Sequence, residues 1–331
     1  MKKLVSFFGD KSEIFLELNE KAKEYAASKG IEYVWAPQKP YDVDDVVKNL
    51  NDADAGLIDV EPYDNKIFDR LTGRCKLLIR YGVGFDKVNL PDATSHGLAV
   101  TRTTGANKTG VAEMALTHIL AARRQLHLNR KVMESGVWVK SLGNELLGKR
   151  VGILGFGNVG AAFAKIIQGF DCEILAYDTY HNDELAKQYG VKWADLDEIF
   201  TTCDAITVHL PYNKDTHKII NADRFKQMKK TAVISCTARG NIIDEDALYD
   251  ALKSGEIAGA GLDVYAQEPL PADSKLLELD NLILTPHVAS QTYDSDWAIY
   301  KKAIDIMADF FDGKPLGRGD LLNPDYKEHL Q

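Results

Sequence analysis

The segment Val151-Gly152-Ile153-Leu154-Gly155-Phe156-Gly157-Asn158-Val159-Gly160, which leads into the helical pattern AAFAKIIQGF, decides the fold. An apolar run that ends in G-x-G-x-x-G and opens a helix is typical of a strand, turn and helix that bind a dinucleotide. Gly155 would permit the tight turn, Gly157 would let a pyrophosphate approach the backbone, and Gly160 would let helix and strand pack closely. The helix N-terminus would add the positive end of its dipole. A tight strand-to-helix turn without a ligand is the alternative.

A second apolar run, EILAYD, ends in Asp178, 18 residues after Gly160. A carboxylate at this spacing can accept hydrogen bonds from ribose hydroxyls. It would also repel the 2′-phosphate of NADP, and Thr179 and Tyr180 supply no arginine to offset that repulsion. We therefore expect NAD as the cofactor. A role for Asp178 as a helix cap or a surface acid is the alternative.

Short apolar runs alternate with helical patterns along the whole chain. Before residue 103 the runs include LVSFF, EYVWA, AGLIDV and KLLIRY, and after residue 149 they include RVGILG, EILAYD, AITVHL, AVISC, GAGLDV and LILTPH. Apolar runs separated by helices predict parallel sheets covered on both faces, and 331 residues predict two domains. Residues 107–136 read as one long helix, and residues 294–313 as a helix that packs back on the first domain. The predicted fold is α/β with two doubly wound parallel sheets.

Composition and charge disfavour several classes of partner. With 40 basic and 49 acidic residues the net charge is -9, which repels nucleic acid backbones and anionic lipid surfaces. We therefore expect neither nucleic acid nor a membrane as partner. The cysteines have no metal-binding or disulfide-framework spacing, so we expect no metal site and reduced thiols; they are Cys75, Cys172, Cys203 and Cys236. The apolar run in MKKLVSFFGD is too short for a signal peptide, so a cytoplasmic protein is expected.

Three side chains near the ends of apolar runs are candidates for chemistry. Arg239 follows AVISC and His287 ends LILTPH, at the sheet edge where doubly wound folds bind ligands. A guanidinium matches the carboxylate of a 2-oxo acid, and a histidine can protonate the ketone oxygen during hydride addition. Glu268, in YAQEPLP, is a candidate partner for His287. A salt bridge for Arg239, a core or capping role for His287 and a solvated loop position for Glu268 stay open, because spacing alone does not join them. His118 and His127 lie on the predicted long helix and are interpreted as packing or surface groups.

In this order, GFGNVG, Asp178, TARG, GLDVYAQEPLP and TPHVAS resemble the D-isomer-specific 2-hydroxyacid dehydrogenase family over nearly the whole chain. The resemblance implies an NAD-dependent oxidoreductase that transfers hydride reversibly between NADH and a small 2-oxo acid. In it, Arg239 binds the substrate carboxylate, His287 is the acid/base and Glu268 pairs with His287. GLDVYAQEPLP and YGVGFDKVN look closer to phosphoglycerate or glyoxylate/hydroxypyruvate relatives, while Cys236 and Ala289-Ser290-Gln291 weaken a lactate-specific reading. An NAD-binding regulator or corepressor of the same fold is the alternative, which the presence of all three catalytic residue types disfavours.

The resemblance also implies the domain organisation and further contacts. A flavodoxin-like substrate-binding domain would comprise residues 1–103 and 288–331, a Rossmann-like NAD-binding domain residues 104–287, and two chains would form a homodimer through the latter. The loop that would hold the substrate carboxylate through backbone N–H groups consists of Tyr81, Gly82, Val83 and Gly84. The implied NAD contacts besides the three glycines are Thr109, Asn158, Val159, Asp178, Pro211, Thr237, Ala238, Arg239, Asp263 and His287.

Overall fold

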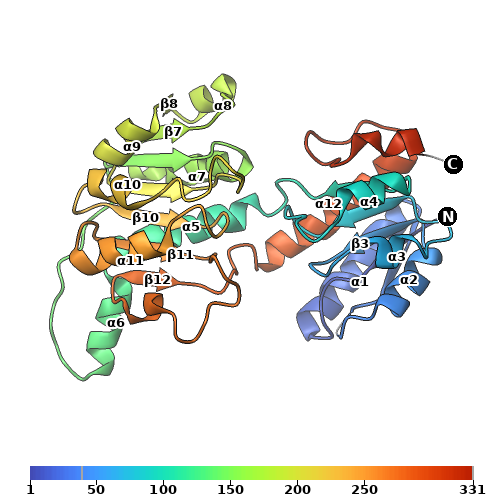
Figure 1. Cartoon of the computed structure of the whole chain (residues 1–331), viewed down its shortest axis with the longest axis horizontal. Coiled ribbons are helices and arrows are strands. Elements are labelled where there is room, and N and C mark those ends of the chain that lie inside the picture. Colours follow the sequence, from blue (N-terminus) through green and yellow to red (C-terminus); the bar gives the residue numbers. More distant parts are fainter. Residues whose placement is uncertain (39, 330–331) are drawn as a thin grey trace. The chain divides into compact units, whose positions relative to one another are not determined.

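The chain divides into two units, each built on one parallel sheet (Figure 1). The structure, a computed structural model, describes residues 1–38 and 40–329. The terminal unit joins residues 1–107 to the chain from Thr292 onward, and the central unit spans Lys108–Gln291. The domain boundaries expected from the sequence, after residues 103 and 287, lie near these divisions.

The central unit contains a seven-stranded sheet in the order β12-β11-β10-β9-β6-β7-β8. Its strands are β6 (Arg150–Leu154), β7 (Glu173–Tyr177), β8 (Val191–Trp193), β9 (Ala205–Val208), β10 (Val233–Cys236), β11 (Gly259–Leu262) and β12 (Leu282–Leu284). All neighbours pair in parallel. The strand order reverses between β6 and β9, which is where sheets of this kind bind ligands, beyond the carboxyl ends of the strands.

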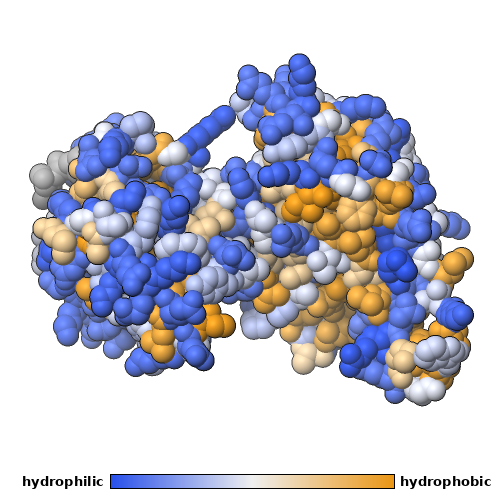
Figure 2. Space-filling view, turned by 180° about the vertical axis from the view of Figure 1, so that it is seen from behind, coloured by the Kyte–Doolittle hydropathy of each residue, from blue (hydrophilic) through white to orange (hydrophobic). Residues whose placement is uncertain are grey.

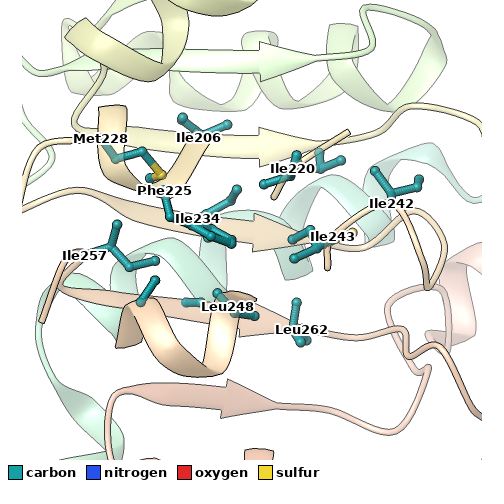
Figure 3. Close-up of a cluster of buried hydrophobic side chains, with 14 of the residues drawn as sticks. Ile206, Ile220, Phe225, Met228, Ile234, Ile242, Ile243, Leu248, Ile257 and Leu262 are labelled. Atoms are coloured by element: carbon teal, nitrogen blue, oxygen red, sulfur yellow. The ribbon is translucent and has the colours of Figure 1, made fainter. Parts of the chain in front are cut away.

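Helices cover both faces of this sheet. They are α5 (Lys108–Arg123), α7 (Asn158–Ile166), α8 (Asp183–Gln188), α9 (Leu196–Thr202), α10 (Ala222–Gln227) and α11 (Glu245–Ser254), with short 3-10 turns at Ile167–Phe170 and Lys275–Glu278. A further helix, α6 (Leu126–Glu134), has no buried residue. One core joins α5 and α7 to the sheet, and a second joins α9, α10 and α11 to its other face. In the second core Phe225 and Leu248 meet Ile206 and Ile234 from the strands (Figure 3). This double cover explains why the strands are apolar at nearly every position.

The terminal unit contains a five-stranded sheet in the order β2-β1-β3-β4-β5, the flavodoxin-like order. Its strands are β1 (Lys2–Ser6), β2 (Ile31–Trp35), β3 (Ala55–Ile58), β4 (Leu77–Arg80) and β5 (Ala99–Arg102). Its helices are α1 (Glu13–Ser28), α2 (Val43–Asn51), α3 (Asn65–Phe68), α4 (Leu90–Ser95) and α12 (Tyr293–Phe311), with a 3-10 turn at Pro324–His329. α1 and α12 pack on one face and α2, α3 and α4 on the other. The predicted α/β class with two doubly wound parallel sheets is thus confirmed.

The prediction of one continuous helix over residues 107–136 is wrong, because the structure has two helices, α5 and α6, in this range. The helix breaks after Arg123, and Gln125 takes a left-handed conformation with φ of 51°. The carbonyl of Arg123 accepts a hydrogen bond from the N–H of Asn144 at 2.8 Å, so the returning chain replaces the next helical bond. Among the described residues, no helix has both the length and the apolar character that crossing a membrane requires.

Candidate active site

The glycine-rich turn lies between β6 and α7, at the point where the strand order reverses. Gly155 has φ of +96°, and a Cβ on it would lie 2.7 Å from the carbonyl carbon of His209. A Cβ on Gly160 would overlap the carbonyl oxygen of Gly155. Packing and backbone conformation within the chain therefore require glycine at these two positions.

Gly157 differs from these two glycines because nothing in the chain itself requires it. It has φ of -82°, and among the described residues other than its two neighbours in the chain no atom lies within 4 Å of the place a Cβ would occupy. Gly157 is the N-cap of α7 and provides no side-chain cap, whereas Asp195, Asn221 and Asp244 cap α9, α10 and α11. The first N–H groups of α7 are thus left for an external acceptor. Open space at an uncapped helix N-terminus fits a pyrophosphate.

Asp178 follows β7 directly and lies beside this turn. Its Oδ2 accepts from the N–H of Phe156 at 2.7 Å, and its Oδ1 accepts from the N–H of Tyr180 at 3.0 Å. The carboxylate caps no helix, since Asn182 is the N-cap of α8. Each oxygen can accept a further bond, so a fixed pair of acceptors stands at the end of β7, as the ribose of a dinucleotide would need.

His287 and Glu268, which spacing alone did not join, are hydrogen-bonded in the structure. The Nδ1 atom of His287 lies 2.7 Å from Oε2 of Glu268, and Oε1 of Glu268 accepts from the N–H of Tyr265 at 3.0 Å. Because an ionised carboxylate only accepts, Nδ1 carries the proton of this bond. The side chain of His287 is 49% exposed. Its Nε2 is therefore the ring nitrogen available to a ligand.

Asp263 holds the segment on which His287 stands. This carboxylate is fully buried and accepts from the N–H groups of Val288 and Ala289, both at 2.9 Å, and from the hydroxyl of Thr285 at 2.6 Å. The N–H of His287 donates to the backbone carbonyl of Asp263 at 2.9 Å. These bonds fix His287 in a left-handed conformation, with φ of 55°, which a non-glycine residue adopts only where its surroundings impose it.

Arg239 lies in the loop that follows β10, as predicted from its place after AVISC. Its side chain is half-buried and donates to the carbonyl of Ala238 at 2.7 Å. Within the described chain it forms no ion pair, so further donors of the guanidinium stay available. A Cβ on the next residue, Gly240, would overlap the carbonyl of Tyr265. The loop of Arg239 therefore packs directly against the loop that leads to Glu268.

The other predicted cofactor residues of the central unit vary in exposure. Pro211, Asn158 and Thr109 are exposed, Val159 and Ala238 are half-buried and Thr237 is buried. Thr109 stands in the first turn of α5. No group of three or more histidine, cysteine, aspartate or glutamate side chains in the described residues could hold a metal ion.

A largely apolar cavity of about 690 Å³ adjoins the His287 and Glu268 pair. Its walls come from the ends of β11 and β12 and the connection between them, namely Tyr265, Glu268, Pro269, Leu270, Leu277, Leu284, Thr285, Pro286 and His287. The two hydrogen-bonded side chains thus stand at the edge of an apolar space rather than on an open polar surface.

The predicted substrate loop belongs to the terminal unit and follows β4. The ring of Tyr81 is buried and stacks on Phe8, and its hydroxyl donates to Oδ1 of Asp296 at 2.6 Å. The N–H of Gly82 already donates to the hydroxyl of Thr103 at 2.9 Å. In the described residues the N–H groups of Val83 and Gly84 have no acceptor within the chain. These two are the donors that the loop can offer to a carboxylate.

Sequence reasoning missed His118 and Thr285 as neighbours of this site. His118 is buried, and its Nε2 lies 3.1 Å from the hydroxyl of Thr285. The same hydroxyl donates to Asp263. The signal was present, because His118 shares a helix face with the buried Ala115 and Ala122. A histidine on the apolar face of a helix needs polar partners, and those partners are distant in sequence.

The chain is similar to known proteins in sequence and in fold. Residues 116–289 match the model of the NAD binding domain of D-isomer specific 2-hydroxyacid dehydrogenases. A glyoxylate reductase from Korarchaeum cryptofilum is 33% identical over 270 residues, 79% of this chain and 81% of that protein. A D-3-phosphoglycerate dehydrogenase from Archaeoglobus fulgidus is 40% identical over 222 residues, 66% of this chain and 42% of that protein. The structure of D-lactate dehydrogenase with NAD+ from Lactobacillus jensenii has a TM-score of 0.82 and 26% identity, and the match covers 97% of this chain and 99% of that one.

Proposed function

Because the chain belongs to the D-isomer specific 2-hydroxyacid dehydrogenase family, an NAD-dependent group of oxidoreductases, we propose that it interconverts a small 2-oxo acid and the D-2-hydroxy acid. The observation that carries this proposal is the hydrogen bond of 2.7 Å between Nδ1 of His287 and Oε2 of Glu268. It directs the other ring nitrogen of a histidine toward a ligand, in the domain that matches NAD-binding relatives.

Bound NAD supplies the hydride acceptor or donor of the reaction. The uncapped N-terminus of α7 and the open space at Gly157 would hold its pyrophosphate, and Asp178 would accept from its ribose hydroxyls. We assign further contacts with the cofactor to Thr109, Gly155, Asn158, Val159, Gly160, Pro211, Thr237, Ala238, Arg239, Asp263 and His287.

We assign the proton transfer to Nε2 of His287. In reduction it delivers a proton to the oxygen of the former carbonyl, and in oxidation it removes the proton from the hydroxyl. Glu268 accepts from Nδ1 and so fixes both the ring orientation and which nitrogen faces the substrate. Asp263 keeps the backbone of the segment in place while the proton moves.

Substrate recognition is assigned to charged and backbone donors. Arg239 offers a planar pair of donors that matches a carboxylate and draws charge from the neighbouring carbonyl. The loop Tyr81–Gly84 contributes the N–H groups of Val83 and Gly84. We propose a short substrate of the size of glyoxylate or hydroxypyruvate, or its 3-phosphorylated form, in line with the names of the relatives.

We also propose that the chain forms a homodimer in the cytoplasm, without nucleic acid or a membrane as partner. All four cysteines are free thiols, as a reducing compartment would maintain them. Large apolar side chains between residues 126 and 147 are exposed in the single chain, which favours burial by a second copy. Figure 2 shows hydrophobic side chains on the face of the central unit seen from behind.

The test follows NADH absorbance while the purified protein is given glyoxylate, hydroxypyruvate, 3-phosphohydroxypyruvate, pyruvate and a branched-chain 2-oxo acid. We expect turnover on at least one short acid. His287→Ala should reduce kcat by at least about a hundredfold, because general acid catalysis contributes that much. NADH fluorescence serves as the control, since the other assigned cofactor contacts should still let the variant bind NADH. NADH binding by the wild type without turnover on any acid would contradict the proposal and favour a cofactor-dependent regulator.

A further inference from the structure

A buried histidine lies beneath the segment that carries His287. His118, on α5, is 1% exposed, and burial lowers its pKa to about 4, so the ring is neutral near pH 7. Its Nδ1 lies 3.3 Å from the hydroxyl of Ser235 on β10, and its Nε2 lies 3.1 Å from the hydroxyl of Thr285 after β12. The proposed reaction assigns it no role.

The sheet makes room for this ring. A Cβ on Gly261, in β11, would overlap Cβ of His118 and would lie 2.5 Å from its Cγ. Glycine at this position lets α5 lie close enough for the imidazole to reach both neighbouring strands. An apolar side chain could fill the same space without needing polar partners, so the choice of histidine calls for an explanation in terms of its hydrogen bonds.

The hydrogen bonds determine which nitrogen of His118 carries the proton. The hydroxyl of Thr285 has one proton, and it donates this proton to the carboxylate of Asp263 at 2.6 Å. Thr285 must then accept from His118, which places the proton of the neutral ring on Nε2. Nδ1 is left as an acceptor for the hydroxyl of Ser235. The chain of donors therefore runs from Ser235 through His118 and Thr285 to Asp263.

This chain of hydrogen bonds ends at the backbone that directly follows the proposed acid/base. Asp263 binds the N–H groups of Val288 and Ala289, directly after His287. The carbonyl of Leu262, at 3.4 Å, is a competing acceptor for the Thr285 hydroxyl. By donating to Thr285 from one side, His118 keeps that hydroxyl turned toward Asp263. Without it the hydroxyl can turn to Leu262, and Asp263 would lose one of its three donors.

We infer that His118 is a positioning residue for the reaction: through Thr285 and Asp263 its Nε2–H holds the segment that presents His287. The inference rests on the proposed acid/base role of His287. The role requires a hydrogen bond donor at the position of Nε2, so an apolar side chain of similar volume should not replace His118.

The kinetic test compares His118→Leu with His118→Gln in the whole enzyme, with kcat expressed per NADH-binding site. The leucine variant should lose about three- to tenfold in kcat, the effect of one buried hydrogen bond, with the KM for the 2-oxo acid changed less than about twofold. The glutamine variant places an amide N–H at the Nε2 position and should recover to within about twofold of the wild type. Equal losses in both variants would show that only packing matters, and wild-type kcat in both would also overturn the inference.

Thr285→Val provides the matched test of the connection. It removes the hydroxyl and keeps the shape, so it should lower kcat about as much as His118→Leu. The double variant should be no slower than either single variant, because both interrupt one chain. Losses that multiply would mean that the two residues act independently and would contradict the inference.

A measurement independent of turnover separates this inference from the proposed function. In 15N-histidine NMR spectra of the wild type, His118 should show a protonated Nε2 and an unprotonated Nδ1 between pH 6 and 8. In His118→Leu the ring signals of His287 should shift, while those of His96, in the terminal unit, should not. A protonated Nδ1, or unchanged His287 signals, would overturn the inference. If the wild type turns over no 2-oxo acid, the proposed function fails while these spectra still decide the placement of His287.

Discussion

We propose that Asp178 sets the preference of the chain for NAD over NADP. Two backbone N–H groups hold its carboxylate at the end of β7, so it cannot easily turn away from a ligand. We predict that Asp178→Ser raises the ratio of kcat/KM for NADPH to that for NADH by at least about tenfold, because a fixed negative charge no longer repels the 2′-phosphate. Asp178→Glu keeps the charge and serves as control. An unchanged ratio in the serine variant would show that Asp178 does not contact the adenosine ribose.

The residues that the sequence made predictable share one property: their partners are close in the chain or at a fixed spacing. Gly155, Gly160 and Asp178 belong to one strand, turn, helix and strand, and the structure places them side by side. In contrast, His287 is separated from Glu268 by 19 positions along the sequence, and His118 is separated from Thr285 by 167. Only the fold brings such residues together, so neither their spacing nor their types could establish these bonds.

At the scale of elements, α6 is unusual because the single chain leaves it without a buried residue. The connection that follows is also apolar and exposed: Trp138 is 80% exposed and Leu142 is 92% exposed. Isolated apolar residues on a surface are ordinary, but a run of them over a helix and its connection marks an interaction surface. A second copy of the chain is the partner that the family resemblance implies.

We predict that Trp138→Glu combined with Leu142→Glu converts a dimer into a monomer, because each charge would have to be buried without a partner. Light scattering after size exclusion measures the mass directly. The control is Ile14→Glu combined with Leu16→Glu on α1, which places charges on exposed apolar positions of the terminal unit and should leave the mass unchanged. A dimer that persists in the first variant would show that the copies associate through another surface.

The break between α5 and α6 shows where helical periodicity failed as a guide. The run from Lys108 to Glu134 keeps an apolar repeat, which favours one helix. Tertiary hydrogen bonds at Arg123 end the helix instead. The backbone carbonyl of Arg123 accepts from the N–H of Asn144, and its guanidinium donates to the carbonyls of Glu145 and Asp204. Such tertiary bonds override a local pattern, and the order of residues along the chain does not reveal them.

At the scale of the whole molecule, the central unit contains a buried histidine, His118, and a partly buried one, His209, whose surroundings oppose protonation. Burial lowers the pKa of His118 to about 4 and that of His209 to about 3, against 6.5 for an unperturbed histidine. Below pH 6.5 the unfolded chain therefore binds a proton at each of these positions, while the folded chain keeps both rings neutral. Protonation thus favours unfolding, and stability is lost as the pH falls from about 6.5 toward these two folded values.

We predict that the free energy of unfolding falls by about 1 kcal/mol per pH unit between pH 6.5 and pH 5 for each of the two histidines, with a slope that steepens toward about 1.4 kcal/mol per unit at the acidic end. Urea titrations of the whole chain at pH 7, 6 and 5 measure this slope. The window stays above the range in which most carboxylates titrate, so loss of ion pairs contributes little to it. His118→Gln removes one titrating ring while keeping an amide donor, so its slope should be about half that of the wild type. A variant with the full slope, or a wild type equally stable at pH 7 and pH 5, would mean that these rings gain protons in the folded chain, which would also contradict a neutral His118 beneath the segment of His287.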